Sequence, residues 1–151
     1  MLYLSLRLVH LVFMGTWFGS NLLSIRDVKT SFAAGPAHLP GLRDRMMRSG
    51  RLATISGGLT LLSGFGLIFM LGGFSSVPRA IHIGLATGIA CSIVGAAGVG
   101  RTWMLIEKKL DAGAEPSTLE PLLKRLTMLS GIFQLLWLVS LVLMVFRAVA
   151  G

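Results

Sequence analysis

Two arginine–histidine pairs have the residue types and the spacing to hold a cofactor. Arg7-Leu-Val-His10 lies near the start of the chain, and the same pattern returns as Arg79-Ala-Ile-His82. Positions three residues apart share a helix face, so each arginine would lie about one turn from its histidine. Neutral imidazole binds metal ions and haem iron, and guanidinium pairs with carboxylate. The pattern therefore predicts one binding device that the chain uses twice.

The elements that carry these pairs are apolar enough to span a membrane. The 151 residues are 54% hydrophobic and only 13% charged, with a mean hydropathy of +0.79. Each apolar run has about 20 residues, which suits a helix that crosses a hydrocarbon core of about 30 Å. The runs cover residues 7–25, 52–74, 78–100 and 126–146. We predict an all-α integral membrane four-helix bundle that forms a single domain over residues 1–151.

The segments between these runs predict how the helices are connected. Residues 26–51 contain Gly35-Pro36 and Pro40-Gly41, which we interpret as breakers in a long loop. Residues 75–78 form a tight turn, which makes the second and third helices antiparallel neighbours. The third connection, residues 101–125, should be helical through Leu110, break at Asp111-Ala-Gly113 and restart near Pro116.

The basic residues indicate membrane topology. The net charge is +8, but eleven of the fourteen lysines and arginines lie in the first and third connections. That distribution does not favour nucleic-acid binding, and by the positive-inside rule it places both connections in the cytoplasm. We expect a protein of the bacterial inner (cytoplasmic) membrane, surrounded by the lipid bilayer, with both termini outside.

Several further matches suggest a tandem repeat of two helical hairpins, residues 1–74 and 75–151. Arg51-Leu52 and Ser56-Gly57 return 74 residues later as Arg125-Leu126 and Ser130-Gly131, and Arg7 and His10 return 72 residues later. Because both halves begin outside, a pseudo-twofold axis along the membrane normal would relate them. His10 and His82 would then face each other at the same depth.

Two facing histidines in a helical bundle can bind the iron of a b-type haem. Arg7 and Arg79 would pair with the haem propionates, while Gly15, Gly19, Gly84 and Gly88 would give the flat ring room. This hypothesis predicts electron transfer, or an oxidation linked to haem or quinone, with a quinone or another redox partner. Dimerisation is left open by the sequence, and a homo-oligomer is one option.

Two alternatives remain open at the sequence level. His10 and His82 with Met70 and Met144 would make a soft site for copper, and hence a copper-binding or copper-transport protein. In the other alternative, the histidines hydrogen-bond within the bundle and the arginines anchor it at the headgroups, which describes a structural membrane subunit without a cofactor.

The stretch from His10 through Trp17 to Gly19 resembles the first helix of two membrane-protein families, those of copper-resistance protein D and of HemJ-type protoporphyrinogen oxidases. His82 and the apolar run after it resemble a later helix of these families. For the HemJ type the resemblance implies haem b and oxidation of protoporphyrinogen; for the copper group it implies copper handling. The HemJ-like helix usually has a lysine shortly after its histidine, where this chain has Ile83 and Gly84.

The remaining polar residues suggest simpler roles. His38 belongs to the first connection, where exposure to water is expected, and Asn21 and Gln134 are expected to hydrogen-bond between helices. The single Cys91 is expected to pack in the bundle. Every acidic residue lies on the cytoplasmic side, away from the histidines, which argues against hydrolytic chemistry at the histidine layer.

Overall fold

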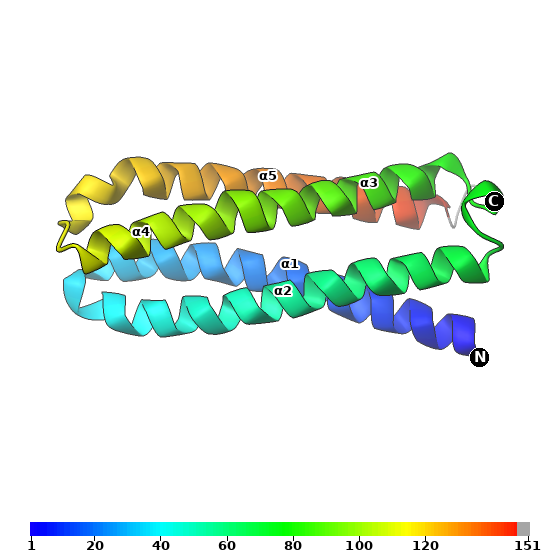
Figure 1. The fold of residues 1–151 in the computed structure, drawn as a ribbon, viewed down its shortest axis with the longest axis horizontal. Helices are drawn as coiled ribbons and strands as arrows, with labels where there is room; N and C mark the ends of the chain where they lie inside the picture. The colour runs from blue at the N-terminus through cyan, green and yellow to red at the C-terminus, as the bar shows by residue number, and fades with distance from the viewer. Residues whose placement is uncertain (148–151) are drawn as a thin grey trace.

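The computed structural model describes residues 1–147, with side chains through Met144, and all of its regular elements are helical (Figure 1). The bundle has four long helical segments. The first is α1 (Leu2–Ala34) and the second is α2 (Leu39–Met70). The third runs without a break through α3 (Arg79–Ile93), the π-helix η3 (Val94–Gly100) and α4 (Arg101–Asp111), and the fourth is α5 (Glu120–Arg147). Short 3₁₀ turns, η1 (Pro36–His38), η2 (Phe74–Ser76) and η4 (Pro116–Leu119), lie in the connections.

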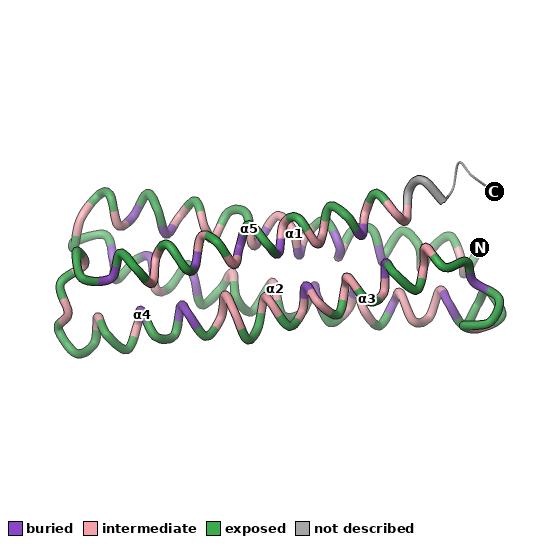
Figure 2. Tube along the Cα trace, turned by 90° about the horizontal axis from the view of Figure 1, so that it is seen from above, coloured by how far each residue is buried: buried purple, intermediate pink, exposed green. Residues whose placement is uncertain are grey.

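The prediction of an all-helical chain with four long apolar helices is confirmed. Four segments are long and apolar enough to cross a membrane: Leu2–Ala34, Pro36–Met70, Arg79–Asp111 and Pro116–Met144. Large apolar side chains also cover the outside of the bundle, as Leu62 at 68% and Phe69 at 67% exposure illustrate. Figure 2 shows the buried positions as short, isolated stretches that recur along the helices between longer exposed ones. An apolar surface this extensive indicates an integral membrane protein.

The first connection is a helical hairpin, so the prediction of a long loop over residues 26–51 was wrong. Only Gly35 breaks the helix, with a φ of +99° that favours glycine. Pro40 and Gly41 are not breakers, because they lie in the first turn of α2. Proline fits there, since the first residues of a helix need no backbone N–H donor. In the third connection, by contrast, the predicted break and restart are confirmed, because α4 ends at Asp111 and η4 begins at Pro116.

One end of the bundle, which we call the closed end, is tightly packed. It contains the α1–α2 turn at Gly35 and the α4–α5 connection at residues 112–119. All four segments contribute to one apolar core there: Val28, Leu39, Leu42, Met46, Trp103, Ile106, Leu119 and Leu126. Salt bridges of 2.7 Å join Arg45 to Asp27 and Arg43 to Asp111 on its surface. The closed end therefore fixes the four segments relative to one another.

The opposite end, which we call the open end, is more loosely packed. It contains the first turns of α1 and α3 and the last turns of α2 and α5. Below it, near the middle of the bundle, lies a small core of Trp17, Cys91 and Phe133. Along most of the bundle α1 packs mainly on α2, and α3 packs mainly on α5. At the open end residues 71–78 join α2 to α3 and so link the two hairpins, while the side chains between the hairpins are less tightly packed than those of the closed end.

The closed-end core predicts which substitutions destabilise the bundle. Replacing the fully buried Ile106 by Ala should lower the free energy of unfolding by about 2–5 kcal/mol, because it removes packed methylene groups and leaves a cavity. Leu105→Ala, at a position that is 46% exposed on the same helix, is the matched control and should have a smaller effect. Denaturant unfolding of the purified protein in detergent measures both. Equal losses for the two variants would contradict this description of the core.

Candidate cofactor-binding cavity

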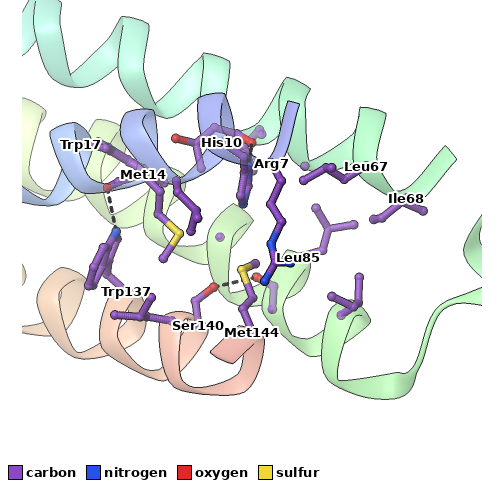
Figure 3. Close-up of a pocket in the computed structure, with 18 of the residues that line it drawn as sticks. Arg7, His10, Met14, Trp17, Leu67, Ile68, Leu85, Trp137, Ser140 and Met144 are labelled. Carbon is purple, nitrogen blue, oxygen red and sulfur yellow. Dashed lines mark hydrogen bonds between the residues drawn. The ribbon is translucent and has the colours of Figure 1, made fainter. Parts of the chain in front are cut away.

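A cavity of about 520 Å³ lies between the two hairpins at the open end, and all four segments line it. This volume falls within the roughly 300–1,000 Å³ typical of small-molecule sites. Most of the wall consists of leucine, isoleucine, methionine and tryptophan side chains. Only a few polar groups reach the cavity, and Figure 3 shows His10 and Arg7 extending into it from α1. The site therefore suits a ligand with a large apolar body and few polar groups.

His10 is buried, and α2 fixes its orientation. Its Nδ1 lies 2.9 Å from the Thr60 carbonyl oxygen and 3.0 Å from the Ser63 hydroxyl oxygen. Ser63 donates its own proton to the Leu59 carbonyl at 2.6 Å. Both neighbours of Nδ1 are therefore acceptors, so Nδ1 carries the ring proton and donates it. In the neutral ring, Nε2 then has a free lone pair, and the ring extends into the cavity (Figure 3).

Gly64 gives the imidazole the room to adopt this position. A Cβ at residue 64 would approach His10 Cε1 to 3.2 Å, which is tighter than an ordinary side-chain contact. A backbone carbonyl that holds one ring nitrogen while the other faces outward is the usual support for a metal-binding histidine. The surroundings of His10 thus match those of a ligand.

Arg7 lines the same cavity one turn toward the open end. In Figure 3 its side chain extends across the cavity toward Leu85 and Met144. Among the residues that the structure describes, no carboxylate forms a salt bridge with it. Asp27, the first acidic residue of α1, lies about 30 Å farther along the helix. Arg7 is exposed overall, so both an anionic group of a ligand and a lipid headgroup are suitable partners for this guanidinium.

The wall opposite α1 comes from α3 and α5. The Ser140 hydroxyl donates to the Gly84 carbonyl at 3.2 Å, which joins α5 to α3. The indole of Trp137 donates to the Met14 carbonyl at 3.1 Å, which fixes α5 against α1. Met144 follows Trp137 by two turns on α5 and also lines the cavity.

His82 does not reach this cavity, so the expectation that it faces His10 is corrected. It is exposed beside Phe74, with ring centroids 6.1 Å apart, and it is not among the lining residues. The packing helices explain the difference. His10 fits against Ser63 and Gly64, whereas the positions 74 residues later are Trp137 and Leu138. These larger side chains leave α5 without the acceptor and the space that α2 offers.

Of the other predicted site residues, Met144 lines the cavity, while Arg79 and Met70 are exposed and do not line it. Gly84 and Gly88 line it as expected, but Gly15 and Gly19 do not. The sequence interpretation missed Met14, which lies four residues after His10 and therefore on its face of α1. It also missed Thr60 and Ser63, whose role depends on contacts between helices.

The remaining polar residues lie outside the cavity or pack in the bundle. His38 is exposed at the closed end. Asn21 Oδ1 is buried without a hydrogen-bond partner in the described part of the chain. Cys91 is a buried free thiol that packs against Phe133 and borders the cavity. Within residues 1–147, no cluster of three or more His, Cys, Asp or Glu side chains could hold a metal ion.

The chain was compared with protein-family models, curated proteins and solved structures. No protein-family model, no curated protein and no solved structure matches the chain. The function is therefore inferred from the geometry of the cavity.

The tautomer of His10 can be tested directly. In protein labelled with ¹⁵N-histidine, His10 should show a protonated Nδ1 and a pyridine-type Nε2 at neutral pH, because both partners of Nδ1 are acceptors. Nuclear magnetic resonance measures both shifts, and a His10→Gln variant assigns them. Gly64→Ala should move the His10 signals, whereas Gly58→Ala, where an added Cβ meets nothing within 4 Å, should not. A proton on Nε2 would contradict the structure.

Proposed function

We propose that this chain is a membrane-embedded protein that binds one haem b in the cavity between its two hairpins. Its role would be electron transfer, or an oxidation linked to haem or quinone. The observation that carries this proposal is the buried His10, whose Nε2 lone pair faces an apolar cavity of about 520 Å³. Imidazole nitrogen, apolar walls and a guanidinium that reaches into the cavity suit an iron porphyrin with two propionates.

The residues present fit the chemistry of this cofactor. His10 would hold the iron, with Thr60 and Ser63 fixing the ring. Arg7 would pair with a propionate and hold it near the mouth of the cavity. When bound, haem supplies one-electron chemistry, while the protein supplies orientation and excludes water. Oxidation of protoporphyrinogen, the activity of the HemJ-type proteins that the first helix resembles, stays one option for the reaction.

A quinone that binds through its carbonyl would not use His10 as its hydrogen-bond donor. Such a carbonyl accepts hydrogen bonds, but Nε2 of neutral His10 is itself an acceptor. A quinone or another redox partner would therefore exchange electrons with the cofactor rather than replace it on His10.

The proposed topology follows from charge. The eleven basic residues of the two long connections surround the closed end, whereas Arg7 and Arg79 lie at the open end. By the positive-inside rule the closed end would be cytoplasmic. The cavity would then lie toward the outer face of the bacterial inner membrane, on the side of the termini. A tandem repeat with a pseudo-twofold axis along the membrane normal accounts for the equivalent lengths of the two hairpins. Its two histidine positions would then have diverged.

Copper binding is the second candidate, and one observation favours it. His10, Met14 and Met144 line the same cavity, so an imidazole and two thioethers are available to a soft ion such as Cu(I). Compared with the copper site predicted from the sequence, His10 and Met144 are kept, and Met14 takes the place of His82 and Met70. Metal analysis separates the two candidates, since about one copper per chain without haem would favour copper. A colourless, metal-free protein would favour the structural subunit.

The absorption spectrum of protein purified from haem-replete cells tests the haem proposal. Wild type should show a Soret band that shifts on reduction, and His10→Ala should lose the band or change it strongly. His82→Ala is the matched control and should keep the wild-type band, because His82 lies outside the cavity. A wild-type protein without a Soret band would overturn the proposal. Loss of the band in His82→Ala alone would overturn the choice of ligand.

The role of Arg7 gives a separate prediction. Arg7→Gln should weaken haem retention by about tenfold, the effect of losing one charge-assisted hydrogen bond at an exposed site. Arg79→Gln is the matched control, since Arg79 lies outside the cavity, and it should leave retention unchanged. Transfer of haem to an excess of apomyoglobin measures the loss. Equal rates for the two variants would exclude Arg7 as the propionate partner.

A further inference from the structure

We infer that Met144 is the second axial ligand of the haem iron, so that the site has one histidine and one methionine rather than two histidines. This inference rests on the proposed function. It departs from the repeat, because His10 of α1 and Met144 of α5 are not equivalent positions of the two hairpins. Met144 lines the cavity from α5, on the wall opposite α1, and its thioether sulfur can bind iron.

The direction of the helices brings the two side chains to one level. Helical side chains lean toward the N-terminus of their own helix. On α1 this tilt carries His10 toward the open end, and on the antiparallel α5 it carries Met144 away from that end. Figure 3 shows the two side chains extending toward each other from opposite walls. The hydrogen bond from Trp137 to the Met14 carbonyl fixes the register of α5 against α1.

The backbone of α3 makes room for Met144. A Cβ at residue 84 would lie 3.2 Å from Met144 Cε and 3.6 Å from its Cγ. Glycine at this position therefore lets the thioether lie along α3, beside the Ser140 hydroxyl that joins the two helices. Gly84 thus leaves space for the methionine of the second hairpin, as Gly64 leaves space for the histidine of the first hairpin.

The other side chains with a suitable atom are less well placed. Tyr3 and Met14 line the cavity but belong to α1, so they lie on the same wall as His10. Cys91 lies deeper, and its sulfur is 3.7 Å from the Phe133 carbonyl, to which it donates. His82 is exposed beside Phe74, and Met70 is 43% exposed.

Methionine ligation has a functional consequence. A thioether favours the reduced iron more than a second imidazole does, and so raises the reduction potential. The site would therefore accept electrons readily from a donor of lower potential. The positive charge of Arg7 would not change this effect on the reduction potential, because a propionate would neutralise that charge.

The test compares Met144→Leu, which keeps the volume of the side chain, with wild-type protein loaded with haem. The variant should retain haem on His10 but lose the low-spin spectrum. Its ferrous form should bind carbon monoxide roughly tenfold or more tightly, because no internal ligand has to be displaced. Met144→His should restore a low-spin spectrum with a lower reduction potential. Met14→Leu and His82→Ala are the matched controls and should keep the wild-type spectrum and affinity.

The outcomes separate this inference from the proposed function. A wild-type protein without haem would overturn both. A haem-loaded wild type whose spectrum and carbon monoxide affinity do not change in Met144→Leu would overturn the methionine assignment and leave the haem proposal intact. Loss of the low-spin spectrum in His82→Ala would also overturn the assignment, in favour of two histidines.

Discussion

The hydrogen bond between His10 Nδ1 and the Thr60 carbonyl is the interaction on which the proposed site depends. It joins α1 to α2 at the open end, and it fixes the tautomer that leaves Nε2 free. Ser63 supports it as a second acceptor, and Gly64 leaves space for the ring. Without these contacts the imidazole could turn toward the bundle or toward lipid. One helix therefore supplies the imidazole, and its neighbour determines which ring nitrogen faces the cavity.

The unequal packing of the two ends explains why a cavity exists. At the closed end, Trp103, Ile106 and Leu42 fill the space between the four segments, and ion pairs surround them. At the open end, small residues such as Gly64 and Gly84 replace large ones, and a cavity lies between the hairpins. The closed-end core already fixes the four segments relative to one another, so the open end holds a cavity in place of a second packed core. The packed core and the cavity therefore lie in different halves of the same helices.

The sequence predicted the four helices well, because apolar runs of about 20 residues have few alternatives. It was less successful at the first connection, since Pro40 breaks a helix in the interior but fits in a first turn. Of the residues that it selected by type, His10 and Arg7, and Met144 of the copper alternative, line the cavity. It could not exclude His82, whose own helix repeats the pattern around His10. The difference lies on the packing helix, where Ser63 and Gly64 are replaced by Trp137 and Leu138. A pattern within one helix predicts which residues could bind a ligand, but packing against the neighbouring helix determines which of them line the cavity.

The most direct test of the central claim is an experimental structure of the protein purified from haem-replete cells in detergent or nanodiscs. Our account predicts planar density in the cavity between the hairpins, with the iron on His10 Nε2 and a propionate near Arg7. The Thr60 carbonyl should still accept the hydrogen bond from Nδ1. A cavity without density in a protein that carries stoichiometric haem, or an iron held by His82, would contradict the account.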